Sequence, residues 1–295
     1  MAETPAIKAG CLYLVLSGEY GTRRPLMSIA EQAVAGGVDV LQMREKHKSP
    51  AALLRLGSAL SELCKKNRVT FIVNDDPQLA KRLDADGVHL GQEDLQRYPV
   101  DTVRQWIGRD RIIGVSTHSL EQFQKANELD ADYLAFGPVF PTRTKNYHIG
   151  TGDIREALRI ARKPVVFIGG VNIVNLEMLL NLGATRVALI RDIMQAEDIA
   201  AKTEWYKDKL RKHSAACGLF AEPSKGETMH IRINGKEEAW PGKAMTLQGL
   251  VIHRGLIPER VVMEVNLRVI PREQWPTIAI QDRDHIEIIS FVGGG

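Results

Sequence analysis

The stretch Thr70-Phe71-Ile72-Val73 is a short run of β-branched and aromatic residues, and such a run predicts a buried β-strand. Similar apolar runs recur along the first two thirds of the chain. Some of them follow a small residue that repeats at Gly37, Ala85, Ala131 and Ala184. The others lie halfway between these positions, at residues 12–16, 70–73, 112–115 and 164–168. The repeat predicts eight strands, spaced about 25 residues apart.

Helical patterns separate the expected strands. Residues 51–67 place Leu53, Leu56 and Leu60 on one face, and residues 176–182 are also expected to be helical. A strand and a helix that alternate eight times over ~200 residues are typical of a (β/α)8 barrel, the α/β fold also called a TIM barrel. The alternative is a doubly wound open sheet, but the eight regular units and the lack of a GxGxxG motif after the first strand favour the barrel.

Composition excludes several classes of protein. The 295 residues are 44% hydrophobic and 25% charged, and no stretch approaches the ~20 apolar residues of a membrane-spanning helix. The net charge of +3 is spread along the chain, without the basic stripe that nucleic-acid binding requires. Three widely spaced cysteines fit neither a disulfide framework nor a CxxC site, and residues 1–10 do not resemble a secretory signal. We therefore expect a cytoplasmic protein without nucleic-acid or membrane partners.

The pattern of the chain changes near His213. Residues 213–228 are small and polar, with a proline and two glycines, and predict a linker. From Met229, polar and apolar residues alternate up to Asn234-Gly235, a strong hairpin signal. We therefore predict a barrel over residues 1–212, a linker over 213–228, and a small α+β domain of ubiquitin-like size over 229–295.

In a (β/α)8 barrel the active site lies at the C-terminal ends of the strands, so the residues after each apolar run are its candidates. Gln42, Arg44 and Lys46 follow the second strand and point to the same side of the chain. Two cations and an amide on one side suit a diphosphate. The alternative interpretation is a solvated strand end.

Carboxylates follow the next two strands. Asn74, Asp75 and Asp76 end the third strand, and Asp94 follows the fourth. Two carboxylates together with phosphate oxygens are a usual set of ligands for Mg²⁺, and Asp75 with Asp94 would meet at the mouth of the barrel. The alternative interpretation is helix capping, which Asp75 or Asp76 would perform ahead of Pro77.

Polar residues also follow the later strands. Ser119 is expected to cap the next helix, which leaves Ser116 as the ligand after the fifth strand, and His118 is interpreted as a surface residue. The loop after the sixth strand is unusually long, as lids are. Candidates in the last three loops are Thr142, Thr144, Lys145, Gly170, Ile190 and Arg191. The whole set implies two phosphorylated substrates and a metal ion, with no nucleophile or general-base triad.

Five motifs in this order resemble thiamine phosphate synthase. They are Gln42-x-Arg44-x-Lys46, Asn74-Asp75-Asp76, Gly91-Gln92-Glu93-Asp94, Gly137-Pro138 with Pro141-Thr142-x-Thr144-Lys145, and Gly169-Gly170. The resemblance spans residues 10–212 and implies that 4-amino-2-methyl-5-(diphosphooxymethyl)pyrimidine is joined to hydroxyethylthiazole phosphate, which gives thiamine phosphate and diphosphate. It also implies a dissociative reaction, in which diphosphate leaves and the thiazole nitrogen captures the pyrimidine-methyl cation.

The same resemblance implies a role for each candidate residue. The pyrimidine diphosphate would be held by Gln42, Arg44, Lys46, Asn74, Ser116 and Lys145. Arg44, Lys46, Ser116 and Lys145 would be the catalytic residues among them. Asp75 and Asp94 would hold Mg²⁺. The thiazole phosphate would meet Thr142, Thr144, Gly170 and the Ile190-Arg191 backbone. The chain departs from the family pattern at Arg191, where a small residue or serine is common.

The C-terminal segment resembles the thiazole-pathway sulfur carrier of the β-grasp type. The resemblance is carried by residues 269–275, by Gln281-Asp282-x-Asp284 and by the ending Gly293-Gly294-Gly295. It implies that the Gly295 carboxylate is adenylated and converted to a thiocarboxylate, with a sulfur-carrier adenylyltransferase and a thiazole synthase as partners. Gly294 and Gly295 lack side chains, so an extended tail can enter a narrow site. Arg283 stands where a glycine is usual and is expected to strain its turn.

Two other functions remain open at the level of the sequence. A thiazole-tautomer isomerase has the same kind of barrel, but we do not expect it to retain Asp75, Asp94 and the Thr142-x-Thr144-Lys145 loop together. A catalytically dead barrel that serves as a scaffold for the sulfur carrier is the non-enzymatic alternative, and the intact motifs argue against it.

Overall fold

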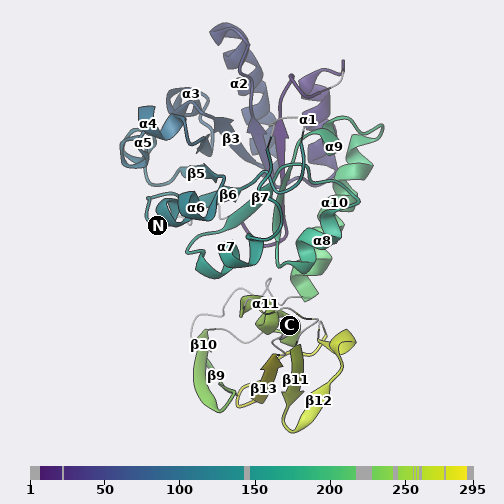
Figure 1. The fold of residues 1–295 in the computed structure, drawn as a ribbon. Coiled ribbons are helices and arrows are strands. Elements are labelled where there is room, and N and C mark those ends of the chain that lie inside the picture. The colour runs from purple at the N-terminus through teal and green to yellow at the C-terminus, as the bar shows by residue number, and fades with distance from the viewer. Residues whose placement is uncertain are drawn as a thin grey trace. The chain divides into compact units, whose positions relative to one another are not determined.

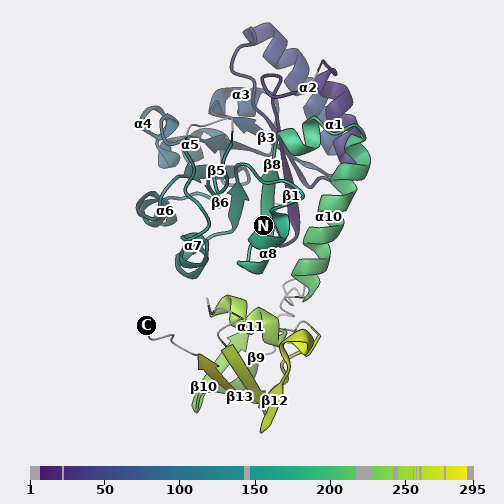
Figure 2. The same ribbon diagram turned by 45° about the vertical axis from the view of Figure 1, so that its right-hand side comes forward.

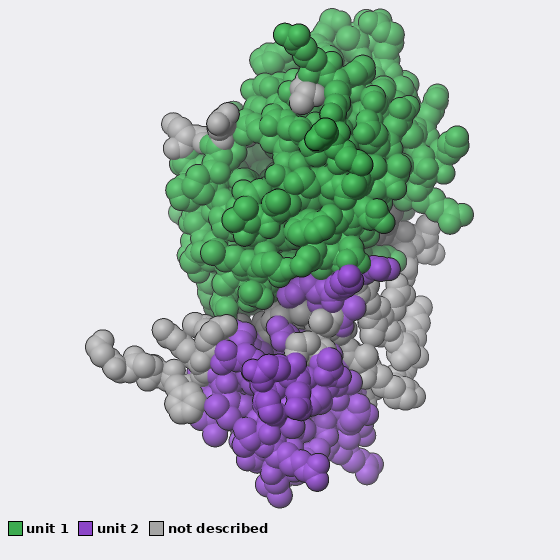
Figure 3. Space-filling view, turned by 90° about the vertical axis from the view of Figure 1, so that its right-hand side faces the viewer, with its two compact units in different colours: residues 1–210 green, residues 211–295 purple. Residues whose placement is uncertain are grey.

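The computed structural model describes residues 7–290, except for Thr22, 143–146, 217–227, 242–244, Gly255, Ile257, 259–260 and Pro276. The chain divides into two compact units, residues 1–210 and residues 211–295, which Figure 3 shows in green and purple. Each unit has its own sheet and its own apolar core, so the two are described separately below.

The first unit is built on a closed barrel of eight parallel strands (Figure 1). The strands follow one another around the barrel in chain order, and β1 pairs with β8 to close it. This confirms the (β/α)8 prediction and excludes the open sheet. The strands are β1 (Cys11–Leu16), β2 (Val40–Met43), β3 (Thr70–Asn74), β4 (Gly87–Leu90), β5 (Ile112–Thr117), β6 (Tyr133–Phe136), β7 (Val165–Ile168) and β8 (Arg186–Leu189).

Helices connect the strands and lie around the outside of the barrel (Figure 2). They are α1 (Leu26–Ala35), α2 (Pro50–Asn67), α3 (Pro77–Arg82), α4 (Asp94–Arg97), α5 (Val100–Ile107), α6 (Leu120–Asn127), α7 (Ile154–Ile160), α8 (Leu176–Asn181), α9 (Arg191–Met194) and α10 (Ile199–Ala216). The expected helices at residues 51–67 and 176–182 correspond to α2 and α8. Helix α10 runs to Ala216, four residues into the segment predicted as a linker, and the rest of that segment up to residue 227 lies outside the described residues.

The side chains of each barrel strand alternate between two apolar layers. On β1, Leu12, Leu14 and Leu16 belong to the large cluster that the helices cover, whereas Cys11, Tyr13 and Val15 belong to a smaller cluster with side chains of other strands. Because successive side chains of a strand point to opposite faces, the smaller cluster fills the interior of the barrel. Residues at the C-terminal ends of the strands therefore surround the top of this interior.

An aspartate stands immediately before three of the even-numbered strands, next to the small residues of the internal repeat. Asp39, Asp86 and Asp132 stand immediately before β2, β4 and β6. Each carboxylate accepts the backbone N–H of the neighbouring odd strand at 2.7 Å, from Leu12, Phe71 and Ile113 respectively. In the fourth repeat, the carbonyl of Thr185 accepts the N–H of Gly10 instead. At each repeat, a carboxylate or a backbone carbonyl thus accepts a hydrogen bond that joins two neighbouring strands at their N-terminal ends.

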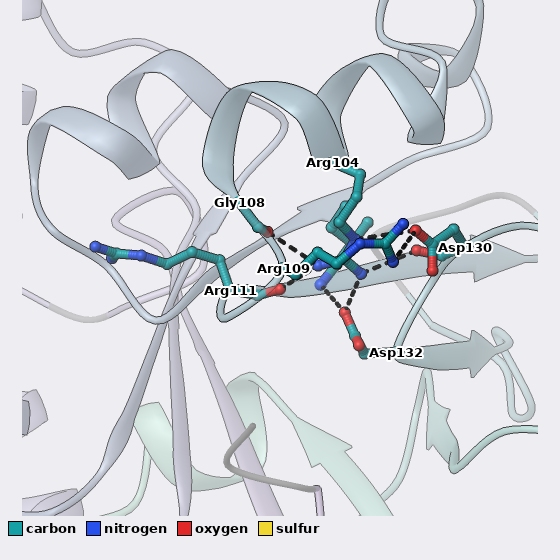
Figure 4. A network of polar contacts seen from close by, with 7 residues as sticks. Arg104, Gly108, Arg109, Arg111, Asp130 and Asp132 are labelled. Atoms are coloured by element: carbon teal, nitrogen blue, oxygen red, sulfur yellow. Dashed lines mark hydrogen bonds and ion pairs between the residues drawn. The ribbon is translucent and has the colours of Figure 1, made fainter. Parts of the chain in front are cut away.

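Asp132 also holds a buried arginine in place (Figure 4). The Arg104 side chain on α5 is only 8% exposed, and its Nη2 donates to the Asp132 carboxylate at 2.6 Å and to the Asp130 carbonyl at 2.9 Å. The Nη1 atom donates to the carbonyls of Gly108 and Arg111. The Asp130 carboxylate lies farther away, 3.4 Å from Nε, and is more exposed than that of Asp132. One carboxylate therefore ties α5 to both β5 and β6.

The second unit has a five-stranded sheet with the order β10-β9-β13-β11-β12. Its elements are β9 (Thr228–Ile233), β10 (Lys236–Pro241), α11 (Leu247–His253), β11 (Val261–Val265), β12 (Arg268–Ile270), the 3-10 helix η2 (Arg272–Gln274) and β13 (His285–Ser290). Strands β9 and β10 form the predicted hairpin, and both Asn234 and Gly235 have positive φ, as a tight hairpin turn requires. Trp275 is 2% exposed and packs in a core shared with Met263 and Ile286.

The turn at Arg283 has the conformation that the sequence led us to expect. Its φ is +68°, in the left-handed region that glycine adopts without strain. The neighbouring Asp284 carboxylate accepts N–H groups from Gln281 and from the Asn266 side chain, at 2.8 and 2.7 Å. These hydrogen bonds hold the turn, so that a side chain at residue 283 is tolerated there.

The two aspartates around Arg104 should differ sharply in their effect on stability. We expect Asp132→Ala to lower the free energy of unfolding by about 3 kcal/mol, because it removes the close carboxylate partner of a buried guanidinium and leaves the Ile113 N–H without its acceptor. Asp130→Ala should cost less than about 1 kcal/mol, because the carbonyl of Asp130 remains and its carboxylate is exposed. Calorimetric unfolding of the full chain measures both, and similar shifts for the two variants would contradict this interpretation.

Candidate active site

A cavity of about 890 Å³ lies at the C-terminal ends of the barrel strands, and the candidate residues line it. Every barrel candidate that the structure describes lines it: Gln42, Arg44, Lys46, Asn74, Asp75, Asp94, Ser116, Thr142, Gly170, Ile190 and Arg191. Thr144 and Lys145 lie outside the described residues, as do Gly294 and Gly295. Residues from β2, β3 and β5 and from the loops after six of the strands therefore meet in one place.

A chain of buried hydrogen bonds crosses the barrel beneath this cavity. The hydroxyls of Tyr13 and Tyr133 lie 2.9 Å apart, and the Gln42 amide donates to the Tyr13 hydroxyl at 2.8 Å. His89 continues the chain, with Nδ1 2.8 Å from the Tyr133 hydroxyl and Nε2 2.8 Å from the Ser116 hydroxyl. The chain joins β2, β1, β6, β4 and β5, so it fixes Gln42 and Ser116 at opposite ends of one rigid network.

His89 is uncharged in this network. Burial lowers the pKa of its imidazole to about 4. Both ring nitrogens face hydroxyl groups, so one nitrogen donates a hydrogen bond and the other accepts one. His89 therefore holds Ser116 in position and is a poor proton acceptor near neutral pH.

The two cations after β2 each have a carboxylate partner. Arg44 Nη1 lies 3.2 Å from Glu19 Oε2, and Lys46 Nζ lies 3.5 Å from Asp75 Oδ2. Both partners are at least partly exposed, so these ion pairs contribute little to stability. The cations are consequently free to exchange these carboxylates for the oxygens of an anionic ligand.

Asp75 and Asp94 face one another in the cavity. Burial, followed by the neighbouring carboxylate of Asp94, raises the pKa of Asp75 to about 6, while Lys46 acts in the opposite direction. The Asp94 carboxylate accepts the N–H of Gly91 at 3.0 Å. Asp76 instead caps α3, because its carboxylate accepts the N–H of Leu79 at 2.9 Å. Both interpretations of this motif therefore apply, each to a different residue: Asp76 caps a helix, and Asp75 lines the cavity.

Glycines after β7 allow the loop after β6 to approach closely. Gly170 has a φ of +66°, and a Cβ there would overlap the carbonyl oxygen of Pro141. Gly169 has a φ of +99°, and a Cβ there would overlap Pro138. The side-chain amide of Asn175 donates to the Gly170 carbonyl at 2.9 Å, which fixes the loop. The glycine pair is required for packing as well as for access to the cavity.

Sequence reasoning missed several residues of this site. His89, Tyr133 and Tyr13 of the buried network were not singled out, although each lies inside a predicted strand or next to one. His118 was expected on the surface, but it lines the cavity, where its Nδ1 lies 2.5 Å from the Gly137 carbonyl and its ring meets Tyr147 edge-on. Ser119 caps α6 as expected. Strand alternation was the available signal for His89, because inward-facing polar residues near a strand's end are exceptional in a barrel interior.

The described residues form neither a cluster of metal-ligating side chains nor a membrane-spanning helix. Among them, no three histidine, cysteine or acidic side chains gather closely enough to hold a metal ion by themselves. None of their helices is long and apolar enough to cross a membrane.

Comparisons with known proteins agree with the cavity's composition. Residues 12–193 match the family model described as thiamine monophosphate synthase, and residues 228–295 match the ThiS family. The thiamine-phosphate synthase of Halalkalibacterium halodurans is 37% identical over 204 residues, which are 68% of this chain and 95% of that protein. That of Persephonella marina is 39% identical over 199 residues, 67% of this chain and 94% of that protein.

A solved structure is similar as well. The thiamine phosphate pyrophosphorylase of Pyrococcus furiosus superposes with a TM-score of 0.63 at 32% sequence identity, over 69% of this chain and 96% of that one. With the barrel, the cavity and these relatives in agreement, the chain belongs to the thiamine monophosphate synthase family of enzymes and carries a ThiS-family domain at its C-terminal end.

Proposed function

We propose that the barrel joins 4-amino-2-methyl-5-(diphosphooxymethyl)pyrimidine to hydroxyethylthiazole phosphate, with thiamine phosphate and diphosphate as products. The observation that carries this proposal is the meeting of all described barrel candidates in one cavity. Cations from the β2 loop, a carboxylate pair, and a glycine-lined wall after β7 and β8 supply places for a diphosphate, a metal ion and a second phosphate. The presence of both Asp75 and Asp94 in this cavity supports coupling over the isomerase alternative.

The pyrimidine diphosphate binds on the β2 side of the cavity. Its phosphate oxygens replace Glu19 at Arg44 and Asp75 at Lys46, the two carboxylates that hold these cations in the free protein. Its pyrimidine ring lies toward Gln42 and Ser116, which the buried network holds at fixed positions. By the family resemblance, Asn74 and Lys145 complete this half of the site.

The residues present fit a Mg²⁺ ion. Asp75 and Asp94 supply two carboxylates at one place, and burial together with the facing Asp94 raises the pKa of Asp75, so a bound cation would favour its charged form. Mg²⁺ is commonly held by one or two carboxylates together with substrate phosphates and water, so a third protein ligand is not required. When bound, the ion neutralises charge on the departing diphosphate.

The residues of this chain suit a dissociative reaction. Arg44 and Lys46 stabilise the negative charge that develops on the leaving diphosphate. His89 does not act as a general base, because it is neutral and both of its ring nitrogens are hydrogen-bonded. The thiazole nitrogen carries its own lone pair and needs no base to attack the pyrimidine-methyl cation. Charge neutralisation and orientation are therefore the contributions of the protein.

The C-terminal domain carries sulfur for making the thiazole. The carboxylate of Gly295 is adenylated and converted to a thiocarboxylate, and its partners are an adenylyltransferase and a thiazole synthase. Support comes from the ThiS-family match, which extends to residue 295, and from the separate core around Trp275, which lets the domain work apart from the barrel. The fused chain thus links sulfur delivery with the enzyme that consumes the thiazole.

Removing one carboxylate of the pair should separate activity from stability. We expect Asp94→Asn to lower kcat/KM by at least about a hundredfold, because loss of metal-stabilised charge is worth several kcal/mol. Its unfolding temperature without Mg²⁺ should not fall, because Asp75 no longer faces a like charge. Asp76→Asn is the matched control, since asparagine also caps a helix. Equal activities of the two variants at saturating Mg²⁺ would contradict the assignment.

The requirement for Mg²⁺ should depend on pH. Asp75 has a pKa raised to about 6, so it is protonated below that pH and is then unable to bind a cation. We expect the Mg²⁺ concentration that gives half of the maximal coupling rate to rise as the pH falls through about 6. Titrations of Mg²⁺ at several pH values measure this, and a constant half-saturating concentration across that range would exclude Asp75 as a ligand.

Deletion of Gly294 and Gly295 should affect one activity alone. Thiocarboxylate formation, measured by mass spectrometry after incubation with an adenylyltransferase and a sulfur donor, should be abolished. The rate of thiamine phosphate formation in the same preparation should match that of the full chain, because the barrel candidates all precede residue 192. A loss of coupling in the deleted chain would mean that the tail contributes to the barrel site.

A further inference from the structure

Glu45 lies between two cations of the cavity but does not take part in the cavity itself. Arg44 and Lys46 line the cavity, whereas Glu45 does not. The Glu45 side chain is nevertheless only 6% exposed, and a buried carboxylate is costly unless it has polar or charged partners. The coupling reaction proposed above gives this buried carboxylate no part.

The partners of Glu45 belong to the turn after β1 and to its own loop. Its Oε1 atom accepts the backbone N–H of Gly18, and its Oε2 atom lies 3.3 Å from Lys48 Nζ. A Cβ at residue 18 would lie 3.2 Å from both carboxylate oxygens, so a glycine is what allows this close approach. The Tyr20 N–H donates to the Ser17 carbonyl at 3.1 Å and closes the turn around Gly18. Glu45 therefore fastens this turn to the loop after β2.

The fastened turn carries two groups that contact the Arg44 guanidinium. Glu19 Oε2 lies 3.2 Å from Arg44 Nη1, and the centre of the Tyr20 ring lies 5.4 Å from Arg44 Cζ. The second contact is attractive because the face of the ring is negative. Phosphate oxygens replace the Glu19 carboxylate when the pyrimidine diphosphate binds, whereas the ring does not have to leave. Tyr20 is thus the contact that keeps the guanidinium in place during binding.

The other side of this loop is held by different groups. The Tyr20 carbonyl accepts from the Gln195 side chain at 2.8 Å, and the Arg24 guanidinium donates to two backbone carbonyls between α9 and α10. These hydrogen bonds tie the loop after β1 to the segment after β8. Glu45 supplies the corresponding anchor on the side of β2. Its loss would therefore release the turn on the side that faces Arg44.

We propose that Glu45 is a positioning residue for the diphosphate site: its carboxylate fixes the turn after β1, and Tyr20 on that turn holds Arg44 where the diphosphate binds. The inference deepens the proposed coupling function and rests on it. Glu45 does not touch the ligand, so it acts on diphosphate binding through Arg44.

Titration calorimetry with inorganic diphosphate and Mg²⁺ tests this site without the coupling reaction. Glu45→Ala should weaken diphosphate binding about tenfold, the usual effect of losing one charged phosphate contact. Glu45→Gln should stay within about threefold of the wild type, because its amide oxygen still accepts the Gly18 N–H. A glutamine variant as impaired as the alanine variant, or an unimpaired alanine variant, would overturn the proposal.

Asp86→Ala is the matched control for a purely structural role. The Asp86 carboxylate also accepts one backbone N–H, that of Phe71 at 2.7 Å, but it does so at the opposite end of the barrel. This variant should unfold at a lower temperature and yet bind diphosphate within about twofold of the wild type, because the two sites are distant. Equal losses of affinity in Asp86→Ala and Glu45→Ala would mean that Glu45 acts only through the stability of the fold.

A double-mutant cycle tests whether Glu45 acts through Arg44. In the Arg44→Ala background, Glu45→Ala should weaken diphosphate binding no further, because the residue that it positions is gone. Tyr20→Leu, on the partly exposed turn, should weaken binding in the wild-type background and likewise have no effect beside Arg44→Ala, which keeps the test available if Glu45→Ala does not fold. Fully additive effects would overturn the positioning role.

The outcomes separate this inference from the proposed function. If the full chain forms no thiamine phosphate from the two substrates, the proposed function fails, whatever the variants do. The diphosphate titrations still decide the inference, because they do not require coupling. Binding that depends on Glu45 through Arg44 supports it, and binding that is insensitive to Glu45, or absent from the wild-type chain, overturns it.

Discussion

Closure of eight parallel strands into a barrel sends every second side chain of each strand into one shared interior, and the rest of this protein depends on how that interior is filled. Most of the interior is apolar, but at the level just below the cavity it holds two tyrosines, a histidine and an amide. Each of these polar groups has a partner within 2.9 Å, which is the condition for burying them without a large cost. The network is the floor of the cavity and fixes the side chains that rise from it.

This floor explains why the cavity is preorganised although its cations can exchange their partners. Gln42 and Ser116 are ends of the buried network, so their positions do not have to be selected when a ligand binds. Arg44 and Lys46 instead rest on carboxylates at distances above 3 Å in partly exposed ion pairs. Such pairs break at little cost when phosphate oxygens replace them. A rigid hydrogen-bonded network with cations above it that can exchange partners suits a diphosphate substrate, because both the substrate and the diphosphate product are polyanions.

The sequence was sufficient to predict the barrel and most of the cavity because both follow from short-range patterns. The repeated small residue and its apolar run predicted eight strands. Because all strands of such a barrel run in the same direction, Asn74, Asp75 and Ser116 at their C-terminal ends were predicted to line the cavity. His89 and Tyr133 were missed because they lie 44 residues apart in the chain, and only the closed barrel brings them together. The same is true of Tyr20, whose ring meets Arg191 only because β1 and β8 pair to close the barrel.

The direction of the strands also distinguishes two sets of aspartates, those that precede a strand and those that follow one. Asp39, Asp86 and Asp132 precede their strands, and each is satisfied by a backbone N–H of the neighbouring strand, so their charge serves stability. Asp75 and Asp94 follow their strands, and there burial and the facing carboxylate raise the pKa of Asp75, so the charged form of this pair is disfavoured in the absence of a metal ion. The carboxylates at the N-terminal end of the barrel thus serve neighbouring strands, whereas Asp75 and Asp94 at the C-terminal end line the cavity, where Lys46 is the cation paired with Asp75. The ligand-binding end can carry the unfavourable facing of two carboxylates because the opposite end gains charge-assisted hydrogen bonds that join neighbouring strands.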